Sequence, residues 1–286
     1  MARLNCVTVL APAKLNLALD VVGLLPSGYH DLDMTMQAIT LYERVVLRRS
    51  PYLNLRLPGS LVAPNNKNTA IKAALAFFDY TGLLAGVDIT IYKNTPVRAG
   101  MAGGSADAAG VLVGLDRLFG TGFSKSRLRE MAVSLGADVP FLIDGGTQRA
   151  RGIGEILTPL PHMPDCTFLI VLAGEKPSTG EMFARLDRLN YPKPDIEKTM
   201  RAISNGSYAE LTQALGNSFS VLWDGREITE KLYNYGADAV ALSGSGPARF
   251  AVFSDEEKAR ATLKALEAEN VKAYLCHTAE SSVKDL

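Results

Sequence analysis

A glycine-rich segment lies just before a long apolar helical pattern. It begins at Pro96 and reads PVRAGMAGGSA, with glycines at 100, 103 and 104. Glycine lets backbone N–H groups approach an anion closely, and a helix N-terminus adds unpaired N–H groups and partial positive charge. The segment therefore predicts an anion cradle, most often for phosphate, where the Ser105 hydroxyl could bind phosphate or Mg²⁺. The alternative is a tight strand-to-helix turn with no ligand.

Two well-known phosphate motifs do not fit this segment. No Lys-Ser or Lys-Thr pair follows the glycines, as a Walker A loop requires. The glycine spacing also differs from a dinucleotide fingerprint, and no strand–turn–helix unit precedes it.

Two polar side chains alternate with leucines near the N-terminus. In residues 14–22, Lys14 and Asn16 fall on one face of an expected strand, and Leu15, Leu17, Leu19 and Val21 on the other. Together the lysine and asparagine could hold a substrate hydroxyl or a phosphate. A solvated polar face on an edge strand explains the alternation equally well.

Asp138 follows a helical pattern and precedes an apolar stretch that begins at Val139. A carboxylate at the edge of a core either caps a helix, forms an ion pair or acts as a general base. From the spacing alone, capping or an ion pair is favoured.

Two loops offer further candidates. Tyr29 and His30 follow a Pro-Ser-Gly turn, where an exposed aromatic ring beside a histidine suits stacking and hydrogen bonding to a planar ring. A tyrosine folded over the edge of the core is the alternative. Residues 243–247, SGSGP, could present N–H groups to an anion or form a bend with close backbone packing.

The elements that must position these residues are strands and helices without strict alternation, which predicts an α+β protein. Pro12 is expected to interrupt the first strand, and helix 68–80 to bury Ile71, Ala74, Leu75 and Phe78. The expected strands are 6–10, 14–22, 36–47, 87–92, 167–172, 238–242, 249–253 and 271–277. The expected helices are 68–80, 106–119, 124–136, 179–189, 195–203, 208–215 and 255–269.

Composition restricts the classes of function. The chain has 286 residues, 30 Lys plus Arg and 30 Asp plus Glu, so it lacks the basic excess typical of nucleic-acid or membrane-surface binding. Its three cysteines and three histidines provide no metal-ligand spacing, so no protein-held metal site is expected. Without a signal-peptide pattern or a long apolar stretch, we expect a soluble cytoplasmic protein.

The length predicts about two domains. Prolines at 159, 161 and 164 read as a linker, which divides the chain into domains 1–160 and 161–286.

Three segments resemble the motifs of the GHMP small-molecule kinases, a superfamily that includes galactokinase, homoserine kinase and mevalonate kinase. They are residues 12–17 (PAKLNL), 96–109 and 243–247, in that order. Segments 26–31 (PSGYHD), 135–141 (LGADVPF) and 145–159 are similar to the branch that acts on a cytidyl-diphospho-methylerythritol. The resemblance covers roughly residues 8–255. It implies a ribosomal S5 domain 2-like N-terminal domain and a ferredoxin-like C-terminal domain, with the site between them.

The resemblance also implies a reaction. ATP, with Mg²⁺, would phosphorylate the 2-hydroxyl of the cytidyl compound, a step of non-mevalonate isoprenoid synthesis. Lys14 and Asp138 match the catalytic pair, with Asp138 as the base. The residues that match ATP-side positions are Pro96, Gly100, Met101, Ala102, Gly103, Gly104, Ser105, Ala106 and, more loosely, Asn68. The substrate-side positions are Asn16, Tyr29, His30 and, more loosely, Thr179 and Phe183.

Some expectations depend on departures or alternatives. Ala102 stands where the family usually has glycine, so nucleotide affinity should suffer if position 102 needs a positive φ. Arg98, Lys176 and Arg149 are candidates for cationic groups near the polyphosphates. A monomer or homodimer is expected. The alternatives are a kinase for another alcohol, such as homoserine, and a non-catalytic nucleotide-binding protein.

Overall fold

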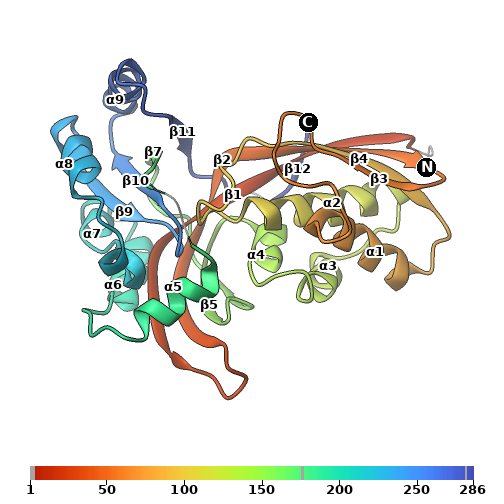
Figure 1. The fold of residues 1–286 in the computed structure, drawn as a ribbon, viewed down its shortest axis with the longest axis horizontal. Helices are drawn as coiled ribbons and strands as arrows, with labels where there is room; N and C mark the ends of the chain where they lie inside the picture. The colour runs from red at the N-terminus through yellow and green to blue at the C-terminus, as the bar shows by residue number, and fades with distance from the viewer. Residues whose placement is uncertain (1–3, 175–176, 281) are drawn as a thin grey trace.

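The computed structural model describes residues 4–174, 177–280 and 282–286. Two sheets organise the described chain (Figure 1). The larger sheet has the path β12-β1-β2-β4-β3, with β5 and β8 attached to β2 and β1, and β6 attached to β5. Its strands are β1 (Cys6–Leu24), β2 (His30–Ser50), β3 (Leu53–Arg56), β4 (Gly86–Tyr92), β5 (Thr147–Gly152), β6 (Ile156–Pro159), β8 (Gly216–Asn217) and β12 (Lys284–Asp285).

Strand β1 runs through Pro12, so the predicted interruption is wrong. β1 and β2 form a long antiparallel hairpin whose register shifts between Pro12 and Ala13 and again between Asn16 and Ala18. Proline cannot donate to a ladder and is tolerated where the pairing is irregular. The strand therefore accommodates the proline at an irregularity and continues.

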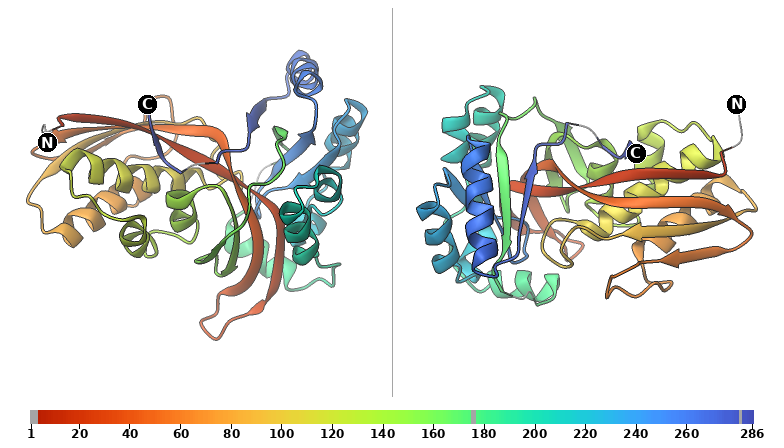
Figure 2. Two further views of the ribbon diagram at one scale, coloured as in Figure 1. Left: turned by 180° about the vertical axis from the view of Figure 1, so that it is seen from behind. Right: turned by 90° about the horizontal axis from the view of Figure 1, so that it is seen from above.

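Four helices lie on one face of the larger sheet (Figure 2). They are α1 (Thr69–Thr81), α2 (Gly103–Phe119), α3 (Lys125–Ala132) and α4 (Val139–Asp144). Helix α2 packs on both β1 and β2, and α1 packs on α2. Helix α1 buries Ile71 and Ala74 as predicted, and Phe78 packs partly buried against the core. Phe77 is buried in place of Leu75, which is 52% exposed, so the prediction for Leu75 is wrong.

The smaller sheet has the antiparallel order β11-β7-β10-β9. Its strands are β7 (Thr167–Leu172), β9 (Ala239–Leu242), β10 (Ala248–Phe253) and β11 (Ala273–His277). The helices and 3₁₀ segment of this half are α5 (Thr179–Leu186), α6 (Ile196–Ser204), α7 (Tyr208–Thr212), η1 (Ser218–Leu222), α8 (Arg226–Asn234) and α9 (Glu256–Ala268). With helices between β7 and β9 and between β10 and β11, this is the expected ferredoxin-like β-α-β-β-α-β arrangement.

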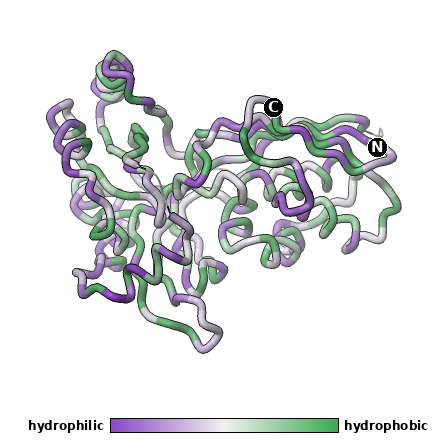
Figure 3. The backbone as a smooth tube through the Cα atoms, viewed as in Figure 1, coloured by the Kyte–Doolittle hydropathy of each residue, from purple (hydrophilic) through white to green (hydrophobic). Residues whose placement is uncertain are grey.

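The two faces of the smaller sheet have different partners. Phe168 and Phe250 pack with helices α6 and α7 and with Leu15 and Leu17 of β1. Alternate residues of β7 and β10 instead pack against α8 and α9. Hydrophilic and hydrophobic residues mix along the outer helix α9 (Figure 3). Leu15 and Leu17 thus bind the two halves together, and their polar neighbours Lys14 and Asn16 alternate with them along β1.

None of the described helices is long and apolar enough to span a membrane.

Candidate active site

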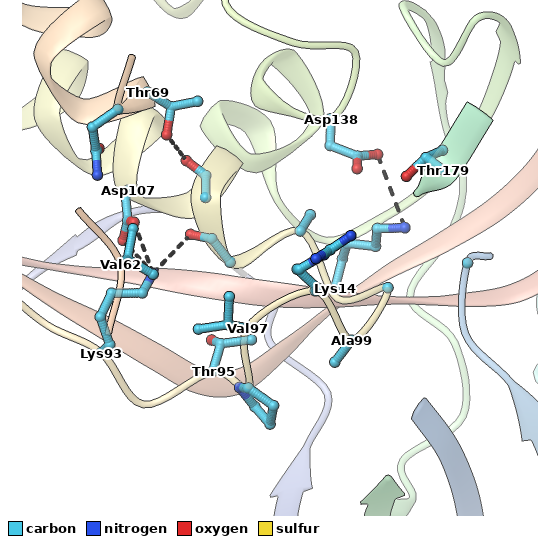
Figure 4. A pocket seen from close by; sticks show the side chains of 18 of the residues that line it. Lys14, Val62, Thr69, Lys93, Thr95, Val97, Ala99, Asp107, Asp138 and Thr179 are labelled. Atoms are coloured by element: carbon cyan, nitrogen blue, oxygen red, sulfur yellow. Dashed lines mark hydrogen bonds and ion pairs between the residues drawn. The ribbon is translucent and has the colours of Figure 1, made fainter. Parts of the chain in front are cut away.

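A cavity of about 490 Å³ brings together residues from both halves of the chain (Figure 4). Lys14 comes from β1, and Asp138 lies at the start of α4. Thr179 of α5 and the Gly244-Ser245 turn complete one side. Of the predicted ATP-side residues, those that line the cavity are Asn68, Pro96, Gly100, Ala102, Gly103 and Gly104.

Lys14 is a buried lysine held by its neighbours. Its Nζ donates to Asn16 Oδ1 at 2.6 Å, and its backbone N–H donates to the Met101 carbonyl at 3.2 Å. Burial lowers the pKa of Lys14, and the nearby Asp138 carboxylate opposes that shift. The lysine is therefore fixed in place, with an ammonium that is less stabilised by water than an exposed one.

Asp138 faces that lysine across the cavity. Its Oδ1 lies 3.9 Å from Lys14 Nζ, and the carboxylate side chain is 32% exposed. Although Asp138 occupies the N-cap position of α4, its side chain makes no capping hydrogen bond within the described residues. Of the readings left open by the sequence, capping is wrong. The carboxylate is paired with Lys14 and accessible to a ligand.

The glycine-rich loop ends at the N-terminus of α2. Gly100 has φ 88°, and Ala102, the N-cap residue, has φ 57° and ψ 31°. Position 102 thus adopts the left-handed conformation that costs an L-residue about 1–2 kcal/mol. Met101 and Ala106 are buried. The loop presents the first N–H groups of α2 to the cavity. The left-handed conformation of Ala102 is the energetic cost of this arrangement.

The SGSGP turn packs directly on this loop. A Cβ at Gly246 would lie 2.4 Å from the Ala99 carbonyl carbon. A Cβ at Gly100 would lie 2.2 Å from the Ser243 carbonyl oxygen. Ser243 Oγ donates to the Gly100 carbonyl at 3.1 Å and accepts from the Asn16 N–H at 3.3 Å. Close backbone packing, one of the two readings from the sequence, is therefore present.

A buried cluster of three charges lies behind the loop, and sequence reasoning missed it. Lys93 Nζ contacts Asp107 Oδ2 at 2.7 Å, Glu43 Oε1 at 2.9 Å and the Gly103 carbonyl at 3.3 Å. Glu43 accepts the backbone N–H groups of Asn94 and Thr95. The cluster connects β2, the loop after β4 and the first turns of α2. Residue spacing carried no signal for it, because its members meet only in the folded sheet.

The predicted ring-binding residues line a second hollow of about 420 Å³. His30 and Phe183 stack with ring centroids 4.3 Å apart and planes at 20°. Tyr29 is 63% exposed, so it is not folded over the core. Thr179 lines both this hollow and the main cavity. The hollow is thus continuous in its lining with the Lys14–Asp138 site.

Other candidates have different surroundings. Asn16 is fully buried beneath Lys14, and the Asn68 side chain caps α1 by accepting from the Ala70 N–H at 3.0 Å. Arg149 forms a two-bond ion pair with Asp33 and contacts Glu197, so its guanidinium is paired with these two carboxylates. Arg98 lines the main cavity. Lys176 lies outside the described residues. Lys67, which the sequence did not single out, also lines the main cavity.

Fold and site together define the class. The GHMP kinases N-terminal domain model matches residues 68–146, and the GHMP kinases C-terminal model matches residues 225–273. A homoserine kinase from Cytophaga hutchinsonii has a TM-score of 0.79 at 18% identity, covering 100% of this chain and 99% of its own, and so shares the fold. The expected α+β fold is confirmed, and the chain is an ATP-using small-molecule kinase by class.

Relatives narrow the class to one branch. The 4-diphosphocytidyl-2-C-methyl-D-erythritol kinase of Pelotomaculum thermopropionicum is 39% identical over 262 residues, 89% of this chain and 91% of the relative. The protein of the same name from Geobacter metallireducens is 38% identical over 271 residues, 92% and 95%. A crystal structure of a 4-(cytidine 5'-diphospho)-2C-methyl-D-erythritol kinase has a TM-score of 0.77 at 29% identity, covering 95% and 99%. The chain belongs to the 4-diphosphocytidyl-2-C-methyl-D-erythritol kinase family.

Proposed function

We propose that this protein transfers the γ-phosphoryl group of ATP to the 2-hydroxyl of 4-diphosphocytidyl-2-C-methyl-D-erythritol, in non-mevalonate isoprenoid synthesis. The observation that carries the proposal is the meeting of Lys14 and Asp138 beside the glycine-rich N-terminus of α2 in one cavity. The substrate follows from the names of the family members.

Asp138 would act as the general base. Its carboxylate is accessible and is not used as a helix cap, so it can accept the proton of a substrate hydroxyl. Lys14, fixed by Asn16, would orient that hydroxyl and offset negative charge as the phosphoryl group transfers. A positioned base contributes roughly 10²–10⁴-fold to a rate. Alignment and charge stabilisation would supply the remainder.

The glycine-rich loop would hold the ATP phosphates through the N–H groups at the start of α2. Lys67 and Arg98 line the same cavity and supply positive charge. The described residues contain no cluster of three or more His, Cys, Asp or Glu side chains suited to a metal. This donor set fits an Mg²⁺ ion held mainly by phosphates and water. Bound there, Mg²⁺ would neutralise phosphate charge. Ser105 lies in the first turn of α2 but is not among the residues that line the cavity.

The hollow beside His30 would hold the cytosine ring. Tyr29 offers an exposed aromatic face, and His30, stacked on Phe183, offers ring nitrogens. Thr179 lines both hollows, which supports a substrate that reaches from the ring site to Asp138.

Three further assignments belong to the same proposal. A domain boundary near residue 160 is supported by the end of β6 at Pro159 and the start of β7 at Thr167, although β8 and β12 pair with β1. The unpaired cysteines fit a cytoplasmic location. We propose a monomer or homodimer that acts without nucleic acid or membrane.

The test is ADP release by the purified protein with Mg-ATP and the cytidyl compound, with homoserine and no alcohol as controls. Release that depends on the cytidyl compound supports the proposal. A preference for homoserine would instead support a kinase for another alcohol. ATP binding without release for any alcohol would support a non-catalytic nucleotide-binding protein.

A further inference from the structure

His30 is held by a carboxylate that no part of the proposed function uses. His30 Nε2 lies 2.9 Å from Asp187 Oδ1. An ionised carboxylate only accepts hydrogen bonds, so Nε2 must carry the proton. A neutral imidazole has one donor and one acceptor, and Nδ1 is then the acceptor. Within the described residues, no hydrogen bond engages Nδ1 of His30.

Asp187 occupies a helix position where a negative charge is unfavourable. It is the C-cap residue of α5, at the negative end of the helix dipole. Cations are favoured at that end and anions are not, so the carboxylate needs a compensating partner. That partner is the His30 ring, which comes from the β1–β2 hairpin. Two hollows, of about 280 and 420 Å³, share both His30 and Asp187 in their linings.

The plane of the His30 ring is fixed as well. Phe183 stacks on it, and Phe183 in turn meets Phe219 edge-on, with ring centroids 4.9 Å apart. The His30 side chain is largely buried, whereas Asp187 is half-exposed. Ring plane and tautomer are therefore both determined by neighbours. The direction of the Nδ1 lone pair follows from them.

We propose that Asp187 is a specificity-determining positioning residue, which keeps Nδ1 of His30 as an acceptor for a ring-bound amino group. This inference rests on the proposed function and deepens it. Cytosine carries an exocyclic amino donor at the position where uracil carries a carbonyl acceptor. An acceptor nitrogen on His30, which lines the hollow, pairs with the amino donor of cytosine and repels the carbonyl oxygen of uracil. Asp187 thus selects cytidyl over uridyl substrates through the His30 ring that it holds.

The variant Asp187→Asn tests this directly. Asparagine can present either its oxygen or its amino group to Nε2, so it holds either tautomer. We expect the ratio of kcat/KM for the cytidyl compound to that for its uridyl analogue to fall about tenfold or more. The KM for ATP should stay unchanged, because the nucleotide loop is in the other cavity. Asp187→Ala should lower the ratio as well.

A matched control lies on the same helix. Glu181 pairs with Arg185 rather than with His30, so Glu181→Gln removes a carboxylate without changing the histidine. We expect the wild-type ratio for this variant. If Asp187 only anchors α5 to the hairpin, Asp187→Asn would lower the melting temperature and leave the ratio unchanged, which would overturn the proposal.

A spectroscopic measurement on the free protein tests the role of Asp187 separately from the proposed function. ¹⁵N NMR of the imidazole above pH 8 should show the proton of His30 on Nε2 in the wild type and a mixture in Asp187→Ala. A proton on Nδ1 in the wild type would overturn the role of Asp187 even if the cytidyl compound is the substrate. Absence of turnover of that compound in the wild type would overturn the proposed function and the specificity role that rests on it.

Discussion

Lys93 Nζ lies 2.7 Å from Asp107 Oδ2 and at the same time 2.9 Å from Glu43 Oε1, so one buried ammonium contacts two buried acidic side chains. Removing one partner of a buried ion pair is costly because the remaining charge is left without compensation. The same lysine contacts the Gly103 carbonyl at the start of α2. The cluster therefore holds the end of the glycine-rich loop in position.

Lys93→Met should destabilise the protein strongly. We expect a loss of about 3–5 kcal/mol in the free energy of unfolding, since the buried Glu43 carboxylate loses its counter-ion and Asp107 loses its hydrogen-bond donor. Denaturant unfolding measures it. Lys93→Arg keeps the charge and should lose less. A loss no larger than that of an exposed ion pair, about 0–1 kcal/mol, would contradict the account.

Asp107→Asn should change how stability depends on pH. Burial raises the pKa of Asp107 from 3.8 to about 7 and Glu43 adds to the shift, while Lys93 opposes it. Between about pH 4 and 7 the folded chain therefore keeps a proton that the unfolded chain releases, and wild-type stability falls across that window. The variant lacks this loss. Its stability relative to wild type should rise from pH 4 to 7 and level off above, and a difference independent of pH would refute this.

Ala102→Gly should stabilise the loop. Ala102 has φ 57°, which glycine adopts without steric cost. We expect a gain of about 0.5–1 kcal/mol and ATP binding at least as tight as in wild type. The same substitution at Ala261, in the ordinary helix α9, should cost about 1 kcal/mol. Equal losses at both positions would show that the left-handed conformation at 102 is not strained.

Gly246→Ala should break the contact between the SGSGP turn and the glycine-rich loop. The added Cβ would lie 2.4 Å from the Ala99 carbonyl carbon, and the backbone of both segments must move apart. We expect a loss of about 1–3 kcal/mol in stability together with a raised KM for ATP. Gly23→Ala adds a Cβ with nothing within 4 Å and serves as the control. Wild-type ATP kinetics in Gly246→Ala would argue against a coupling of the two segments.

Local sequence patterns predicted the bounds of helices and strands better than the residues against which they pack. The strand 167–172 has the expected bounds, and the helix over 106–119 starts three residues earlier, at Gly103. Alternation placed Lys14 and Asn16 together correctly, because period two is a local property of a strand. It did not predict that Asn16 lies buried beneath Lys14, since that depends on Met34 of β2 and Ser243, which contact Asn16.

The parts that were missed depend on long-range contacts. Glu43 and Asp107 look like ordinary polar residues in a strand and a helix, and they become a site only when β2, β4 and α2 pack together. The pairing of Lys14 with Asp138 was expected from the resemblance to the GHMP kinases and not from spacing. No sequence pattern indicated Asp187, because its proposed role depends on its contact with the His30 ring.

The most direct test of the catalytic proposal is the single-turnover rate of Asp138→Asn with Mg-ATP and the cytidyl compound, measured together with the binding of both substrates. Asparagine keeps the shape of the side chain and cannot accept the proton. If Asp138 is the base, the rate falls roughly 10²–10⁴-fold while both dissociation constants stay near wild type. A variant that keeps most of its rate with normal binding would contradict the role of Asp138.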